Sequence, residues 1–108
     1  MRESNFIGRI KEKADTRALV VSAMEEAIAQ VALQNKMAPK NATAAMEAVR
    51  EELARDVSTH RLADLRSVAE DVALNAFAAL GYDNAKIHGD LYVAVDDNIN
   101  NRTKQKTA

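Results

Sequence analysis

The chain lacks several of the residues on which common folds and sites depend. It has no cysteine, which excludes disulfide bonds, thiolate metal ligands and thiol nucleophiles. Three glycines and one proline are too few for the tight turns of a fold built from many short strands. We therefore expect an all-α protein.

Long apolar runs are also missing. No segment approaches the roughly 18 consecutive apolar residues of a membrane-spanning helix. The opening residues, MRESNFIGRIKEK, contain no apolar run of signal-peptide length. We expect a protein that does not associate with membranes and that works in the cytoplasm or an equivalent reducing interior.

Alanine dominates the apolar residues that are present. Apolar residues make up 47% of the 108-residue chain, and 21 of them are alanines. Alanine is the best helix former but buries little area. The sequence therefore predicts one small domain with a thin core, in which helices approach closely and a partner surface or self-association adds buried area.

Apolar residues at spacings of three and four predict three main helices, over about 16–36, 42–57 and 60–80, with short elements at both ends. The first helix should end before Pro39, because a proline restricts the residue ahead of it. Asn41 has the side chain of a good N-cap for the second helix. We therefore expect a small helical bundle.

The third expected helix ends in the segment VALNAFAAL, Val72 to Leu80, which is apolar at every position except Asn75. A helix that is apolar all round should be buried all round, at the centre of the fold or in an oligomer interface. For Asn75 we favour a position toward a groove or solvent, because a buried amide needs hydrogen-bond partners. Gly81 suits the left-handed residue that ends a helix, with Tyr82 packing back on Phe77.

Beyond Gly81 the pattern allows two structures for residues 91–100. Apolar residues in LYVAVDDNI repeat at helical spacing, after a possible cap at Asp90, whereas the LYVAV segment has strand propensity. We favour a helix, and a strand would leave an open edge for a partner. Residues 1–101 are expected to form the single domain and 102–108 a basic tail.

The segment EELARDVSTHRLADL, Glu51 to Leu65, resembles the helix-turn-helix of DNA-binding proteins. Only two residues, where those families have four, separate Glu-Leu-Ala from Val-Ser. The missing residues would complete the first helix and the turn that sets the two axes at about 90–120°. The net charge of −1 also provides no basic field for phosphate binding. We therefore favour a structural joint or one long bent helix, and keep Arg61 and Arg66 as candidate nucleic-acid contacts.

No set of residues indicates catalysis or metal binding. Asp56, His60 and Asp64 would line one helix face, but no second histidine lies nearby in the sequence to complete a metal site. His88 falls in an expected turn, where a lone histidine is usually solvated. The chain also has no glycine-rich phosphate loop. We therefore predict a non-enzymatic protein with no catalytic residues, metal or cofactor.

These expectations favour a module that binds another protein, as a small inhibitor or adaptor of a larger macromolecular machine. In size and lack of motifs the chain is similar to the small accessory proteins of phages and mobile elements. The alternatives are a small DNA-associated regulator, using residues 51–65 or the basic tail, and a structural subunit of a larger assembly; a homo-oligomer is also compatible. The candidate interaction residues are Val72, Asn75, Ala76, Ala79, Tyr92, Arg102, Lys104 and Lys106.

Overall fold

The computed structural model describes residues 2–55 and 61–107, with the side chains of 16–55 and 61–103. Within these ranges it contains four helices and no strand. The helices are α1 (Arg2–Gln34), α2 (Pro39–Arg55), α3 (Leu62–Ala79) and α4 (Ala85–Thr107). The all-α prediction is confirmed, but the predicted number of three main helices is wrong.

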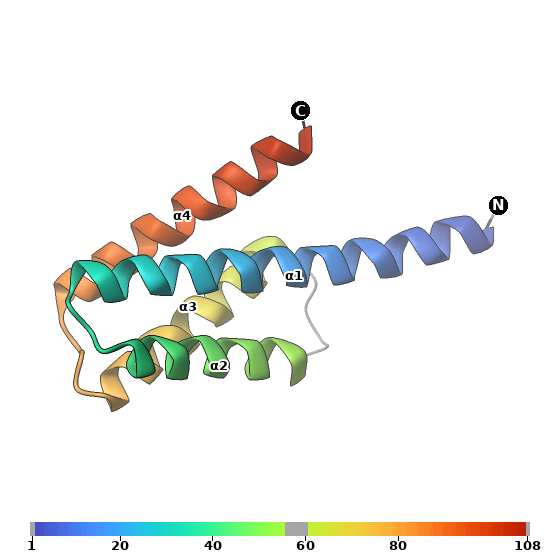
Figure 1. The fold of residues 1–108 in the computed structure, drawn as a ribbon. Helices are drawn as coiled ribbons and strands as arrows, with labels where there is room; N and C mark the ends of the chain where they lie inside the picture. The colour runs from blue at the N-terminus through green and yellow to red at the C-terminus, as the bar shows by residue number, and fades with distance from the viewer. Residues whose placement is uncertain (1, 56–60, 108) are drawn as a thin grey trace.

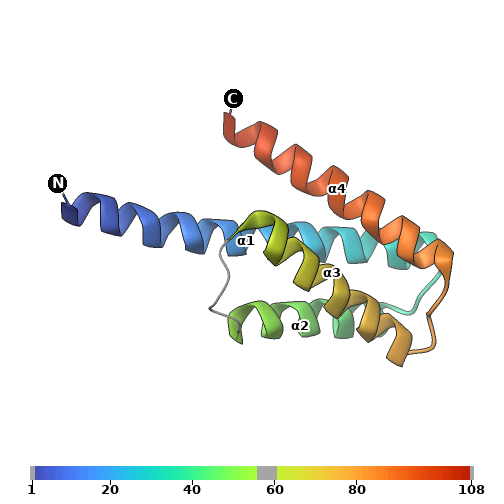
Figure 2. The ribbon, with the colours of Figure 1, turned by 180° about the vertical axis from the view of Figure 1, so that it is seen from behind.

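Helix α1 is the longest helix, and the other three pack against it (Figure 1). Its 33 residues span about 50 Å, and it contacts each of the other three helices. Helices α2 and α3 pack against each other and against α1, while α4 runs back along α1 and touches α3 only slightly. Seen from behind, α3 and α4 cover the same side of α1 (Figure 2). The first third of α1 projects beyond the other helices, which makes the molecule elongated, 52 × 30 × 20 Å.

The core is built from one stripe of each helix. Phe77, Met24 and Ile28 are its largest fully buried side chains. Alanines occupy many of the positions where helices meet, as the composition predicts. They include Ala23, Ala27, Ala45, Ala69 and Ala73, each fully buried. Small side chains at these contacts allow close packing but bury little area per residue.

The expected short first element and the helix over 16–36 are one continuous helix, α1. Gly8 does not end this helix, because an internal glycine costs only about 1 kcal/mol. Helix α2 begins at Pro39 rather than after Asn41. A proline fits the first helical turn, where its missing N–H has no partner to lose. Asn41 instead donates its side-chain amide to the Tyr82 hydroxyl at 3.1 Å.

Two helices end in the Schellman arrangement, in which an N–H bonds back to the carbonyl five residues earlier. At the end of α3, Tyr82 donates its N–H to the Phe77 carbonyl at 2.8 Å, and Gly81 has a φ of 95°. This part of the sequence prediction is confirmed. At the end of α1, Met37 donates to Ala32 at 2.9 Å, and the left-handed residue is Lys36, with a φ of 54°.

The strand alternative for residues 91–100 is wrong, because they lie inside the 23-residue helix α4. Of the side chains that favoured a strand, Tyr92 and Val93 are exposed, whereas Val95 is buried in the core at the helical spacing of Leu91 and Ile99. The cap is Asn84, whose side-chain oxygen accepts the N–H of Ile87 at 3.0 Å, rather than Asp90. The chain therefore offers no open strand edge here, and α4 continues through the expected tail to Thr107.

The segment VALNAFAAL is not buried all round within the single chain, and its burial in an oligomer interface stays a prediction. Ala73, Leu74 and Phe77 face the core, whereas the other side of this segment is exposed. Alanine forms helices whether or not it is buried, so an alanine-rich segment can be apolar without having an apolar environment. Asn75 lies on the exposed side, as favoured from the sequence.

Candidate docking surface

An apolar hollow of about 300 Å³ lies where the end of α1 meets the start of α2. We call it the α1–α2 hollow. Its lining includes Ala29, Leu33, Met37, Pro39, Ala42 and Met46. Leu33 is 82% exposed, more than any other large apolar side chain of the part that the structure describes. The surface is therefore apolar and open to solvent.

The local sequence explains why a hollow forms here. Small side chains, Ala29 on α1 and Ala42 on α2, leave room between the two helices. The left-handed Lys36 reverses the chain within a short connection, and Met37 tucks its side chain against the core, 8% exposed. Pro39 then starts α2, so the hollow has helices as two walls and this connection as its end.

Charges differ between the two ends of the hollow. Glu25 and Arg50 lie one helical turn beyond Ala29 and Met46, and Arg50 Nη2 approaches Glu25 Oε2 to 3.1 Å. This ion pair makes that end neutral. At the connection end Lys36 and Lys40 are exposed, and the structure gives neither an ion-pair partner among the side chains it describes. The connection end is therefore positive.

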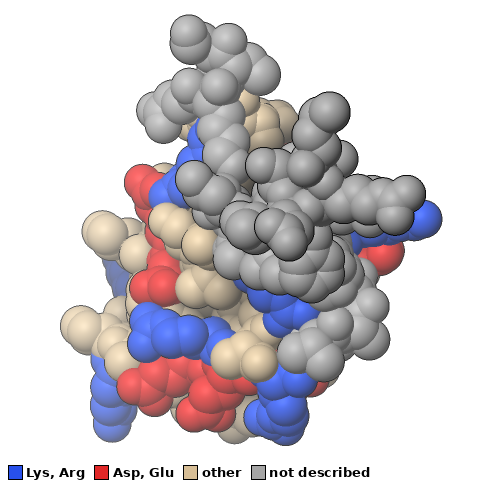
Figure 3. Space-filling model, turned by 90° about the vertical axis from the view of Figure 1, so that its right-hand side faces the viewer, with Lys and Arg blue, Asp and Glu red and all other residues tan. Residues whose placement is uncertain are grey.

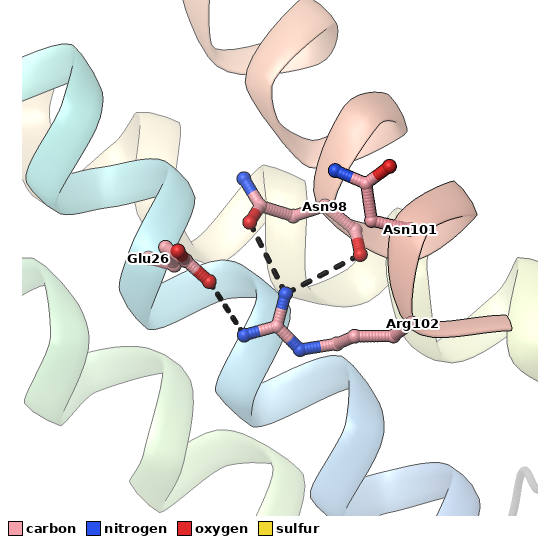
Figure 4. A pocket seen from close by; sticks show the side chains of 4 residues that line it. All are labelled: Glu26, Asn98, Asn101 and Arg102. Carbon is pink, nitrogen blue, oxygen red and sulfur yellow. Dashed lines mark hydrogen bonds and ion pairs between the residues drawn. The ribbon is translucent and has the colours of Figure 1, made fainter. Parts of the chain in front are cut away.

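A second, polar pocket of about 330 Å³ lies between α1 and α4, lined by Glu26, Asn98, Asn101 and Arg102 (Figure 4). Arg102 donates from Nη2 to Glu26 Oε2 at 2.6 Å and from Nη1 to Asn98 Oδ1 at 3.1 Å. It also donates to Ser22 Oγ at 3.2 Å. These bonds fasten α4 to α1, so we call the group of Ser22, Glu26, Asn98 and Arg102 the α1–α4 clasp. A phosphate would have to replace these bonds to reach the guanidinium.

The candidate interaction residues from the sequence do not form one site. Val72 and Ala76 are partly buried and pack against the core, while Asn75 and Ala79 are exposed on α3. Tyr92 is 43% exposed on α4, which α3 barely touches. Arg102 belongs to the clasp, and the side chains of Lys104 and Lys106 lie outside the described residues.

None of those candidates lines the α1–α2 hollow. One signal in the sequence could have identified it. Leu33 lies outside the apolar stripe of α1. The members of that stripe, such as Ile28 and Val31, are buried. A large apolar residue on the polar side of an amphipathic helix is the feature that marks this surface.

The segment Glu51 to Leu65, which resembles a helix-turn-helix, covers the end of α2 and the start of α3. Residues 42–80 form two helices, α2 and α3, which pack against each other, rather than one long helix. The joint itself, including Ser58, Thr59 and His60, lies outside the described residues. On the face drawn in Figure 3, Lys and Arg alternate with Asp and Glu among the residues described, and no broad basic patch forms there.

The two candidate nucleic-acid contacts have different surroundings. Arg66 forms ion pairs within the fold. Its Nη1 lies 2.8 Å from Asp96 Oδ1, and its Nε lies 3.4 Å from Glu70 Oε1. The contact with Asp96 links α3 to α4, whereas the contact with Glu70 lies within α3. Arg61 is exposed at the N-cap of α3 and makes no side-chain cap hydrogen bond.

Glu70 is the most unusual ionisable residue of the bundle. It is only 7% exposed, and its Oε2 atom is buried without a hydrogen-bond partner. Burial raises the pKa of the Glu70 carboxyl, because removal from water disfavours the charged form, and the nearby Arg66 opposes this shift. The carboxylate is therefore held in a site that favours its neutral form.

The start of α4 meets the end of α1 in a small polar cluster. Asp90 Oδ2 accepts hydrogen bonds from Lys86 Nζ at 2.8 Å and Asn35 Nδ2 at 3.2 Å. These bonds lower the pKa of the Asp90 carboxyl, because they stabilise its charged form. His88 Nε2 lies 3.2 Å from Asp83 Oδ1 on the surface.

Neither a metal site nor a membrane span is found in the part of the chain that the structure describes. No three of its histidine, aspartate and glutamate residues are grouped so that they could hold a metal ion. No described helix has both the length and the apolar character needed to cross a bilayer. The chain matches no family model, no curated protein and no solved structure.

Proposed function

We propose that this protein is a non-enzymatic protein-binding module, a small adaptor or inhibitor that attaches to a larger macromolecular machine. The α1–α2 hollow is the observation that carries the proposal. It combines an apolar lining with Leu33, which is 82% exposed at its edge. Full burial of a leucine side chain is worth about 1.5–3 kcal/mol, so a partner that covers Leu33 gains a substantial part of its affinity there.

The basic side chains give less support to a DNA-associated regulator. Arg66 and Arg102 are held in ion pairs with Asp96 and Glu26. Binding to DNA draws much of its energy from protein cations that displace the counterions condensed on the phosphates. Arg66 and Arg102 are already neutralised by carboxylates within the fold.

The test is affinity capture from the native cell extract with the full chain, followed by identification of bound proteins and nucleic acids. The wild type is compared with Leu33→Lys and with Val93→Lys. Val93 is the matched control, because it is 63% exposed and lies on α4, away from the hollow. We expect a defined protein that the wild type and Val93→Lys retain and that Leu33→Lys loses.

Three outcomes would contradict the proposal. Capture of nucleic acid in place of protein, with binding that weakens steeply in salt, would favour the DNA-associated regulator. A mass of the purified protein far above that of a dimer at micromolar concentration would favour a structural subunit. Turnover of a small substrate that depends on His60 or His88 would overturn the non-enzymatic assignment.

A further inference from the structure

We propose that the α1–α2 hollow binds a short amphipathic helix of a partner protein, with carboxylates at the end of the helix that lies over Lys36 and Lys40. This inference rests on the proposed function and adds the chemistry and orientation of the bound segment. It follows from the dimensions of the hollow, the nature of its walls and the charges at its two ends.

The dimensions indicate a short segment rather than a broad interface. The lining residues of α1 run from Ala29 to Leu33, about one helical turn, and those of α2 run from Pro39 to Met46, about two turns. At about 300 Å³ the hollow is at the lower end of the range for binding pockets. Two apolar side chains that stand one turn apart on a partner helix match the α1 wall, which is the shorter of the two.

The walls favour a helix over an extended strand. The walls of the hollow are the two helices α1 and α2 rather than the edge of a sheet. An added strand needs free N–H and C=O groups at a sheet edge, and no sheet exists among the residues the structure describes. A helix needs no such groups, because it satisfies its own backbone and places an apolar face in a groove.

The charges determine the orientation. Lys36 and Lys40 are exposed at the connection end, whereas the other end is neutralised by the pair of Glu25 and Arg50. The exposed Glu47 follows Met46 on α2 and would repel a carboxylate placed toward that neutral end. Carboxylates on the partner are therefore attracted to the connection end alone. This complementarity should speed association and fix the direction of the helix, and it should weaken with salt.

The probes are two helix-forming peptides of about 16 residues, which carry the same pair of leucines one turn apart. Beyond the second leucine one peptide carries three glutamates and the other three lysines. Affinity for the full-length protein is measured by fluorescence anisotropy at about 50 mM and about 500 mM salt. The binding site is mapped by amide chemical shifts of the isotope-labelled protein.

We expect the glutamate peptide to bind at least about tenfold more tightly than the lysine peptide in low salt, and the ratio to shrink in high salt. The shifted amides should cluster around Leu33 and Met46. Lys36→Glu/Lys40→Glu should reverse the preference. Arg55→Glu/Arg61→Glu makes the same change of charge at exposed positions away from the hollow and should leave the preference unchanged.

Equal binding of the two peptides, a preference for lysine, or no binding by either peptide would overturn the inference. Shifts that avoid the hollow would overturn it as well, while a partner captured through Leu33 would leave the proposed function standing. A wild-type dimer that Leu33→Lys converts to monomer would identify a second copy of this chain as the occupant. If the capture experiment found no protein partner but the peptides bound as expected, the proposed function would be contradicted and the inference about the hollow would stand.

Discussion

Lys36 adopts a backbone conformation that disfavours its own side chain. Its φ of 54° lies in the left-handed region, which costs a residue with a Cβ about 1 kcal/mol or more. Gly81 has the same role at the end of α3 without this cost. The fold is therefore less stable with lysine at this position than it would be with glycine. The proposed attraction between Lys36 and carboxylates of a partner gives a reason for the lysine.

We predict that Lys36→Gly raises the free energy of unfolding by about 1 kcal/mol, because glycine adopts the left-handed region freely. Urea unfolding followed by circular dichroism measures the change. Gly81→Ala is the matched control with the opposite sign, because a Cβ there meets no atom within 4 Å and only the backbone conformation is penalised. A lower stability for Lys36→Gly would show that the lysine side chain itself stabilises the fold.

Glu70 makes stability depend on pH. Its folded-state pKa is raised above the ordinary 4.5, so the folded protein binds the proton more tightly than the unfolded chain does. The free energy of unfolding should therefore fall as pH rises from 4.5 through the folded-state pKa. Glu70→Gln removes this titration, so the stability of the variant relative to wild type should increase over the same window. Glu51→Gln, the same change at an exposed glutamate of α2, is the control; an identical pH profile for both variants would contradict the assignment.

At the scale of the element, α4 is attached mainly to α1. The α1–α4 clasp joins residues far apart in the chain, with Arg102 reaching Ser22 and Glu26. Helix α4 makes no contact with α2 and few with α3. Its attachment therefore rests on the buried stripe of Leu91, Val95 and Ile99 together with this clasp.

We predict that Arg102→Ala lowers the free energy of unfolding by about 1–3 kcal/mol. The reason is that Asn98, which is only 5% exposed, loses the hydrogen bond that its Oδ1 accepts from Arg102 Nη1. Hydrogen exchange should accelerate in the second half of α4 and remain unchanged in α2. Arg61→Ala, at an exposed arginine with no cap bond, should change stability by less than about 0.5 kcal/mol. Uniform acceleration in all helices would contradict a local role for the clasp.

Periodicity was sufficient to predict most elements but not their full extents. The helices near 42–57 and 60–80 were predicted within a few residues of α2 and α3, and the cap at Gly81 was predicted correctly. The lengths of α1 and α4 were missed, because Gly8 and the segment LYVAV have local preferences that the surrounding helix overrides. Local propensity is a weak guide where helical spacing and tertiary packing agree.

The candidate site could not be predicted, because it depends on two helices meeting. The position of Leu33 outside the apolar stripe of α1 is visible in the sequence, but its place beside Met46 of α2 is not. The clasp is similar, since the sequence indicated Arg102 as part of a basic tail and gave no sign of its partner Glu26. Contacts across 76 or more positions follow from the arrangement of the helices rather than from local pattern.

At the scale of the molecule, the bundle does not extend to the start of α1. The first third of this helix extends beyond the other three in both ribbon views (Figures 1 and 2). Arg17, which donates to the Leu53 carbonyl, marks where α1 meets the end of α2. The buried side chains of α1 among the described residues begin at Val20.

We therefore predict that a chain lacking residues 2–15 still folds, with a melting temperature within about 5 °C of the full chain. Thermal unfolding followed by circular dichroism at 222 nm measures it. A chain that lacks residues 85–108 is the contrasting truncation, because it loses Leu91 and Val95, both fully buried. A larger loss from the first truncation than from the second would contradict this description of the fold.

The pairing of the first and last helices also has a consequence for biosynthesis. Chains emerge from the ribosome in sequence order, so α4 leaves it after α1, α2 and α3. The apolar side of α1 that α4 covers therefore remains uncovered until residues as late as Ile99 and Arg102 are outside the tunnel. A ribosome that stalls after α3 would hold a nascent chain in which α1 lacks the cover of α4, a substrate for chaperones that the folded bundle no longer presents.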